Sequence, residues 1–144
     1  MITVASADEM FELGVKIAAH LKRGDLILVN GPLGAGKTVL TQGLGKGLGI
    51  TEVTSPTFVI SRVHKAPLPM IHVDVYRLID SDNPSLYLDD LDLDIENSVT
   101  VIEWGGAESA RLSEDRLEIT IDRSDEIRKV EIKCAGKRWA GFSL

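Results

Sequence analysis

An octapeptide near the N-terminus constrains this chain more than any other feature. Residues 31–38 read Gly-Pro-Leu-Gly-Ala-Gly-Lys-Thr and directly follow the apolar run 26–29, Leu-Ile-Leu-Val, which is typical of a buried strand. The pattern G-x-x-x-x-G-K-[ST] after a strand is the phosphate-binding P-loop, and it predicts a helix from Lys37. At ordinary residue frequencies, roughly half a per cent of chains this long would contain the pattern by chance. We therefore expect an α/β fold built around a strand–loop–helix unit that binds a nucleotide.

The bulk composition fits one compact domain over residues 1–144 and limits its partners. With 44% hydrophobic and 26% charged residues, the chain suits a single core with no room for a second full domain. Its formal net charge of −6 repels a phosphate backbone, so we expect any connection to RNA to run through a partner protein. No apolar stretch approaches the ~18 residues of a membrane span. The N-terminus also lacks a basic segment before an apolar core, and we expect a cytoplasmic protein.

The single cysteine excludes an internal disulfide. Cys134 ends the alternating segment 130–134, which is typical of a strand. We interpret its side chain as a small buried hydrophobe in a reducing cytosol.

One helix is predicted before the strand that precedes the octapeptide, and a second helix is predicted after that strand. Residues 7–22 place apolar side chains three or four apart, with Ser6 as N-cap and Glu9 completing a capping box, and this helix should end near Gly24. The second helix should run from Lys37 to about residue 48. It contains three glycines that the sequence does not explain, Gly43, Gly45 and Gly47.

The rest of the chain has mostly strand character. The predicted strands are residues 58–63, 70–78, 99–102, 117–122 and 129–134. A Pro-Leu-Pro break at 67–69 makes a hairpin of the first two, and the last two alternate like half-exposed antiparallel strands. The expected fold is a single P-loop NTPase-type α/β domain, with a central mixed parallel and antiparallel sheet flanked by helices.

The octapeptide supplies groups that can hold a nucleoside triphosphate. Backbone N–H groups at a helix N-terminus bind phosphate oxygens, and the amides of Gly34, Ala35, Gly36 and Lys37 would fill this role. We expect the Lys37 ammonium to bridge the β- and γ-phosphates and the Thr38 hydroxyl to ligate Mg²⁺. The competing interpretation is a glycine-rich turn with a surface lysine, which would require motif and strand to coincide by chance.

Two acidic residues stand where a magnesium nucleotide site needs a carboxylate, at the end of an apolar strand. Asp74 follows residues 70–73, and Glu103 follows residues 99–102. Taken alone, each acid is equally well explained as a solvated charge at a strand end. Glu103 follows the cleaner apolar run and is the metal-linked candidate. Asp74 better fits a role in placing the attacking water or holding a sensing loop.

Other polar residues carry weaker signals. Residues 54–57, Thr-Ser-Pro-Thr, lie where nucleotide-responsive loops occur, but a Ser-Pro turn has the same sequence. The three histidines lack the spacing of a zinc site, and the aspartates from Asp90 to Asp94 lack the glycine and glutamate of a calcium-binding loop. Trp104 fits either core packing or a lid near Glu103, and Trp139 fits the core or an edge cover.

Four segments, in this order and spacing, resemble the bacterial TsaE (YjeE) family. They are Gly34-Ala35-Gly36-Lys37-Thr38, Ser55-Pro56-Thr57-Phe58, His72-Val73-Asp74-Val75-Tyr76-Arg77-Leu78 and Ile102-Glu103-Trp104. The resemblance covers nearly the whole chain, and the combination of the last three segments is far more specific than the P-loop alone. It implies a small P-loop ATPase needed for the threonylcarbamoyl modification of adenosine 37 in tRNAs that read ANN codons.

The resemblance also implies roles for individual residues. The nucleotide cradle would comprise Gly34, Ala35, Gly36, Lys37, Thr38 and Val39. Thr38 and Glu103 match the family's magnesium positions, and Asp74 matches an acid important for hydrolysis. Thr57 matches a switch-like threonine and Trp104 an indole beside the site.

Two further residues match nucleotide contacts of the family outside its firm motifs. These are Ala7, at the start of the first helix, and Arg128, in the C-terminal strands. The chain departs from the family at Gln42, where many relatives carry Arg, and in its glycine-rich stretch 43–49. Because Gln42 is not basic, the role of the family's arginine at this position is not transferred to it.

The cofactors implied by the resemblance are ATP and Mg²⁺, and the partners are the threonylcarbamoyl-transferase TsaD and its paralogue TsaB. We expect an ATPase that is weak alone, reaches tRNA only indirectly and drives cycling of the transferase complex. The main alternative is a small-molecule kinase, but only Arg62 and Arg77 lie in the middle of the chain to build an acceptor pocket. A GTPase would need an N-K-x-D sequence, which is missing. An adaptor that binds nucleotide without hydrolysis stays open.

Overall fold

The computed structural model describes residues 2–32, 34–50, 53, 61–74, 94–103, 113–123 and 126–144. The strands are β1 (Ile2–Val4), β2 (Leu26–Asn30), β3 (Ser61–His64), β4 (Met70–Asp74), β5 (Val99–Glu103), β6 (Arg116–Asp122) and β7 (Arg128–Ala135). The helices are α1 (Ala7–Ala18) and α2 (Lys37–Gly47), with short 3-10 helices η2 (Ile95–Asn97) and η3 (Lys137–Trp139). Within these residues the strands form one sheet in the order β1-β7-β6-β2-β5-β4-β3.

The sheet is mixed, with a parallel centre and antiparallel edges. Strands β4, β5, β2 and β6 are parallel neighbours, whereas β3 pairs antiparallel with β4 and β7 antiparallel with β6. The predicted fold class and the predicted hairpin around residues 67–69 are both confirmed. Strand β2 carries the octapeptide at its carboxyl end, and all of its first four residues are buried. Such a strand reads as a continuous apolar run because both of its faces are covered.

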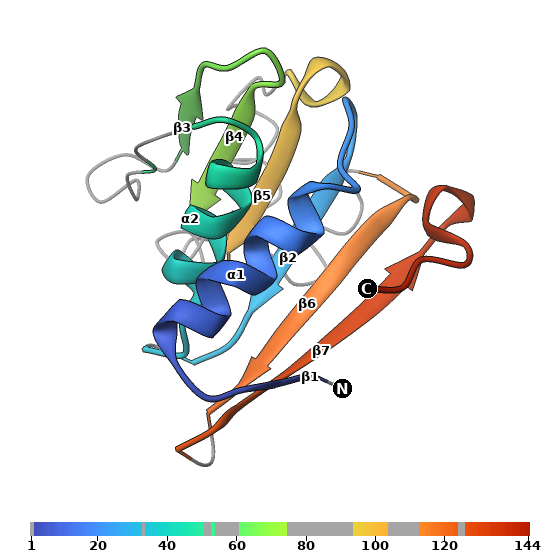
Figure 1. The fold of residues 1–144 in the computed structure, drawn as a ribbon. Coiled ribbons are helices and arrows are strands. Elements are labelled where there is room, and N and C mark those ends of the chain that lie inside the picture. The colour runs from blue at the N-terminus through green and yellow to red at the C-terminus, as the bar shows by residue number, and fades with distance from the viewer. Residues whose placement is uncertain are drawn as a thin grey trace, which may run out of the picture.

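Helices α1 and α2 lie side by side over one face of the sheet (Figure 1). The main core lies between these helices and the strands, where Ile17, Leu40 and Leu44 meet side chains such as Ile27, Val29, Val101 and Ile119. Figure 1 also shows β1 at the outer edge beside β7, next to the N-terminus. This packing fixes the position of the first turn of α2 relative to the ends of the central strands.

Helix α1 begins where the sequence predicts, and it ends earlier. The Ser6 hydroxyl accepts a hydrogen bond from the Glu9 amide at 3.1 Å, as expected of an N-cap. The Glu9 carboxylate reaches back to the amide of Ala5 at 2.6 Å instead of to Ser6 itself. The helix ends at Ala18 and not near residue 22, and Gly24 adopts a left-handed φ of 88° in the turn before β2.

Two of the three unexplained glycines of α2, Gly43 and Gly47, allow it to pack closely on α1, whereas Gly45 faces Val53. A Cβ built on Gly43 would collide with the carbonyl oxygen of Phe11, and one on Gly14 would collide with that of Leu40. A Cβ on Gly47 would collide with the side chain of Ala18. Each glycine costs about 1 kcal/mol of helix propensity relative to alanine, so close backbone packing offsets an intrinsic weakness of α2.

The C-terminal strands alternate as predicted, but two details differ from the sequence analysis. Cys134 lies in β7 and is exposed, so its interpretation as a buried side chain is wrong. The error arises because alternation alone does not tell which face of a strand is covered. Strand β1 was not predicted, because its three residues carry too short a pattern. Trp139 is buried at 1% exposure, so of its two expected roles, core packing or edge cover, the structure supports core packing.

None of the described helices is long and apolar enough to cross a membrane. The predicted strand residues 58–60 and 75–78 lie outside the described residues.

The helix contact predicts an unusual response to a helix-favouring substitution. Gly43→Ala should lower the free energy of unfolding by about 1–3 kcal/mol, because overpacking against Phe11 exceeds the gain in helix propensity. Urea unfolding followed by circular dichroism measures the change. Lys46→Ala, at an exposed position of the same helix, should stay within about 0.5 kcal/mol of the parent chain. A Gly43→Ala variant as stable as the parent would show that the two backbones are not in contact.

Candidate functional site

The described residues of the octapeptide lead from the end of β2 into α2, whose first two residues are Lys37 and Thr38. Gly36 is the N-cap residue, with a left-handed φ of 110°, and Lys37 begins the helix. Gly34 also has a left-handed φ, of 76°, and a Cβ there would lie 2.6 Å from the Arg123 guanidinium. The left-handed backbone favours glycine at this position, whereas the exposed Arg123 side chain could move to admit a Cβ. Thr38 is exposed in the first helical turn, where a hydroxyl can reach a ligand at the helix N-terminus.

Lys37 is buried at the base of this turn. Its Nζ donates hydrogen bonds to the carbonyl oxygens of Gly31 at 2.8 Å and Pro32 at 2.9 Å. Burial lowers the pKa of Lys37 below its ordinary value of 10.5, and the negative charges of Glu103 and Asp74 oppose this shift. The lysine thus lies within electrostatic reach of both acids identified in the sequence.

The two acids lie beside each other at the carboxyl edge of the sheet. Asp74 is the register partner of Glu103 across the parallel strands β4 and β5, and Glu103 is in turn the register partner of Val29 in β2. Side chains alternate along a strand, so Glu103 shares the helix-covered face with Val99 and Val101. Glu103 is buried at 4% exposure, and Asp74 is half-buried. The burial of Glu103 rules out its interpretation as a solvated charge at a strand end.

His72 contacts Glu103 directly. Its Nε2 lies 2.7 Å from Oε2 of the Glu103 carboxylate, and both side chains are buried. The spacing of the three histidines in the sequence does not predict a zinc site. Among the described residues no group of three or more His, Cys, Asp or Glu side chains is arranged to hold a metal ion. The contact with Glu103 had no sequence signal, because it depends on the register between two strands 31 positions apart.

A pocket of about 310 Å³ opens beside the turn and holds several residues that the family resemblance implicates. Its lining includes Gly34, Ala35, Gly36, Val39, Ala7 and Arg128. Ala7 comes from the first turn of α1, and Arg128 comes from the start of β7. The Arg128 guanidinium donates to the carbonyl oxygens of Glu126 at 3.0 Å and Gly34 at 3.4 Å. Residues far apart in the sequence therefore meet around the octapeptide.

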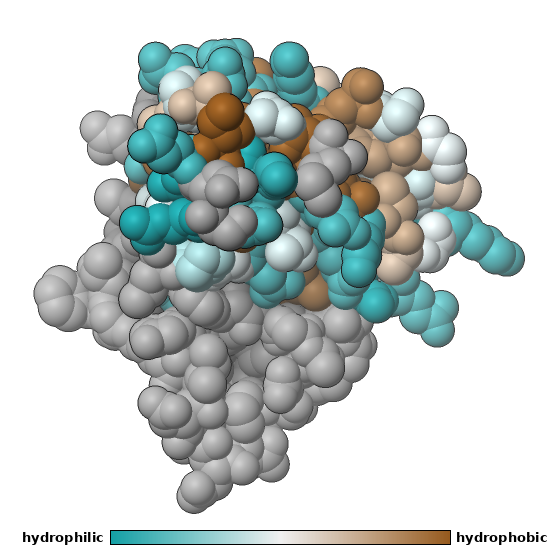
Figure 2. All heavy atoms as spheres, turned by 90° about the horizontal axis from the view of Figure 1, so that it is seen from below, coloured by the Kyte–Doolittle hydropathy of each residue, from teal (hydrophilic) through white to brown (hydrophobic). Residues whose placement is uncertain are grey.

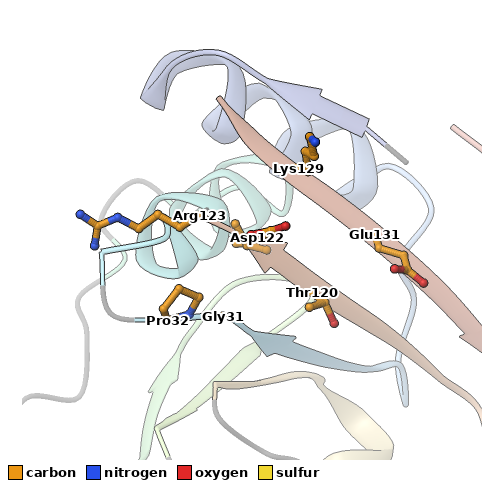
Figure 3. A pocket seen from close by; sticks show the side chains of 8 residues that line it. Gly31, Pro32, Thr120, Asp122, Arg123, Lys129 and Glu131 are labelled. Carbon is orange, nitrogen blue, oxygen red and sulfur yellow. The ribbon is translucent and has the colours of Figure 1, made fainter. Parts of the chain in front are cut away.

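A larger pocket, of about 680 Å³, lies against the first two residues of the octapeptide and the strands β6 and β7. Figure 3 shows Thr120 and Glu131 on these strands, Gly31 and Pro32 below Asp122 and Arg123, and the Arg123 side chain extending outward. The lining of the larger pocket mixes cations and acids, and neither pocket is lined by Lys37 or the two strand-end carboxylates. The smaller pocket is the one of the two that is lined by Gly36, the N-cap residue of α2.

The end of the molecule that carries the octapeptide is largely hydrophilic where the structure describes it. Figure 2 views this end, toward which β4, β5 and β2 run in Figure 1. Hydrophilic residues dominate the described surface there, with hydrophobic ones among them.

Thr57 and Trp104, which the resemblance implicates, lie outside the described residues. Arg123 has no counterpart in the sequence predictions, since a single arginine after a strand carries no motif.

A comparison with known families matches residues 4–130 to the TsaE family, described as threonylcarbamoyl adenosine biosynthesis protein TsaE. Three curated relatives carry the description tRNA threonylcarbamoyladenosine biosynthesis protein TsaE. The protein of Streptomyces coelicolor is 49% identical over 142 residues, covering 91% of this chain and 94% of that protein. Those of Mycobacterium tuberculosis and Bacillus subtilis are both 39% identical, the former covering 84% of this chain and 77% of its own length. The match to the Bacillus subtilis protein covers 85% of this chain and 77% of that protein.

The fold is also similar to a solved structure. The crystal structure of Bacillus subtilis YdiB superposes with a TM-score of 0.78 and 31% sequence identity, covering 96% of this chain and 87% of that one. The sequence prediction of the family and of the fold is thereby confirmed.

The charges around Lys37 predict a measurable titration change. Because Glu103 raises the pKa of Lys37, Glu103→Gln should lower that pKa further, and Asp74→Asn should lower it by less. Nuclear magnetic resonance of the Lys37 side chain across the alkaline range measures both shifts. The exposed Lys46 at the far end of α2 is the internal reference. An unchanged Lys37 pKa in both variants would contradict the electrostatic contact.

Proposed function

The chain belongs to the TsaE family of threonylcarbamoyl adenosine biosynthesis proteins, and from this premise we propose that it binds ATP with Mg²⁺ and hydrolyses the ATP. Family membership places the chain in tRNA threonylcarbamoyladenosine biosynthesis. The observation that carries the proposal is the convergence of Lys37, Asp74 and Glu103 at the helix N-terminus that ends the octapeptide. A buried cation, two adjacent carboxylates and the backbone amides of a helix N-terminus are the complement of a magnesium triphosphate.

The phosphates would be held by the amides of the turn and by Lys37. The Lys37 ammonium, now hydrogen-bonded to Gly31 and Pro32, would exchange these carbonyls for phosphate oxygens. Thr38 and Glu103 would hold Mg²⁺, which neutralises charge on the triphosphate when bound. Asp74, half-buried beside Glu103, is suited to orient the attacking water and accept its proton.

The nucleoside would lie in the pocket of about 310 Å³ beside the turn. Val39 and Ala7 offer apolar surface there, and the Arg128 guanidinium offers a planar cation that can stack on a base. This placement would bring the triphosphate to the N-terminus of α2 and the base toward α1 and β7. Thr57 and Trp104 keep the roles that the family resemblance implies, as a switch threonine and an indole beside the site.

We propose TsaB and TsaD as the partners that make hydrolysis useful. The formal net charge of −6 disfavours a direct grip on tRNA, and so supports an accessory that acts on a transferase complex. The ATPase cycle would reset that complex between turnovers.

A hydrolysis assay with and without the TsaB–TsaD pair tests this function. The pair should stimulate ATP turnover, and Asp74→Asn and Glu103→Gln should each reduce the stimulated rate roughly 100-fold or more while leaving the fold intact. Phosphate release measures the rate, and circular dichroism checks the fold. Indifference to the pair would overturn the coupling, and unchanged turnover in both variants would remove the two acids from the catalytic set. Phosphorylation of a small-molecule acceptor would establish a kinase instead.

Arg128 tests the placement of the nucleoside. Arg128→Ala should weaken ATP binding about tenfold, which equals ~1.4 kcal/mol, because the cation beside the pocket is lost. Isothermal titration calorimetry gives the affinity. The matched control is Lys133→Ala, which removes an exposed cation from the same strand away from the pocket and should bind ATP like the parent chain. Equal affinities for all three proteins would place the nucleoside elsewhere.

A further inference from the structure

One buried polar pair at the strand edge stands out from its surroundings. His72 is fully buried in β4, and its Nε2 lies 2.7 Å from Oε2 of Glu103 in β5. An ionised carboxylate only accepts hydrogen bonds, so the donor in this contact is the Nε2–H of His72 and the acceptor is Oε2 of Glu103. The adjacent residues in the two strands, Val73 and Ile102, are buried and apolar.

The register of the parallel strands fixes this contact. His72 is opposite Val101, two residues before Glu103, so histidine and glutamate are diagonal neighbours on the helix-covered face. Asp74, the next residue of β4 on that face, is directly opposite Glu103. The Glu103 carboxylate is therefore held from one side by an imidazole and lies beside a second carboxylate.

The stability of the fold does not by itself explain a histidine at position 72. Its Nδ1 is buried and has no hydrogen-bond partner among the described residues, and such a group costs about 1–3 kcal/mol. Buried polar pairs can often be replaced by apolar side chains of similar volume at no loss of stability. The feature that an apolar side chain could not reproduce is the hydrogen bond to Oε2.

We infer that His72 is a positioning residue, which fixes the Glu103 carboxylate by engaging Oε2 so that the carboxylate presents its second oxygen to Mg²⁺. The inference rests on the proposed function, because it assumes that Glu103 holds Mg²⁺. A hydrogen-bond donor behind a metal-binding carboxylate restricts its rotation and so favours the bound geometry. His72 itself touches neither nucleotide nor metal in this arrangement.

A magnesium titration of nucleotide binding tests the inference without relying on hydrolysis. Binding of a fluorescent ATP analogue is measured as Mg²⁺ is raised, and again in EDTA. His72→Phe should raise the Mg²⁺ concentration for half-maximal binding about tenfold and leave binding in EDTA unchanged. His72→Gln keeps a donor near the Nε2 position and should stay within about threefold of the parent chain. His64→Phe is the matched control, since His64 is a buried histidine at the other end of the same hairpin.

Each result has a separate meaning. A parent-like Mg²⁺ titration of His72→Phe overturns the positioning role, and so does an equal loss of binding in EDTA, which indicates general damage to the site. A parent chain whose ATP binding ignores Mg²⁺ overturns the proposed function instead. If His72→Phe does not fold, His72→Asn replaces it, because its amide is polar but too short to reach Glu103, and the same tenfold change is expected.

Discussion

The parallel register of β2, β5 and β4 is the constraint on which the candidate site depends. Parallel strands end at one edge of a sheet, and this register puts Asp74 opposite Glu103, and Glu103 opposite Val29 just before the octapeptide. Slipping β4 by one residue would turn Asp74 and His72 to the other face and separate both from Glu103. The side chains of these strands are packed on both faces of the sheet, so a slip would also disrupt the packing of their apolar residues. The core thus specifies the site.

The packing of α1 against α2 positions a second wall of the candidate site. The glycine contacts let α1 approach α2 closely, and the first turn of α1 then reaches the pocket through Ala7. Met10, on the same face of α1, is within 3.3 Å of a Cβ built on Gly36. A bulkier α1–α2 interface would move this wall of the pocket outward. The glycine-rich stretch of α2 therefore contributes to the shape of the pocket as well as to stability.

The sequence was most informative where chemistry follows a local pattern. The octapeptide after an apolar strand predicted the turn and α2, and the apolar runs before Asp74 and Glu103 identified both acids as candidates. The structure adds that the two acids are register partners. Features that depend on distant partners were missed. Strand β1 exists through pairing with β7, His72 meets Glu103 through strand register, and Arg123 meets Gly34 through the β6–β7 hairpin. The exposure of Cys134 likewise depends on which face of β7 the core covers.

The hydrogen bonds of Lys37 to Gly31 and Pro32 have a consequence for the entropy of ligand binding. The long lysine side chain is already held in one place, so much of its rotamer entropy is lost during folding and not during binding. An anion bound at Lys37 would replace two carbonyl acceptors and would not need to order a free side chain. Binding then pays less in conformational freedom, which is how a preorganised receptor gains affinity from few contacts.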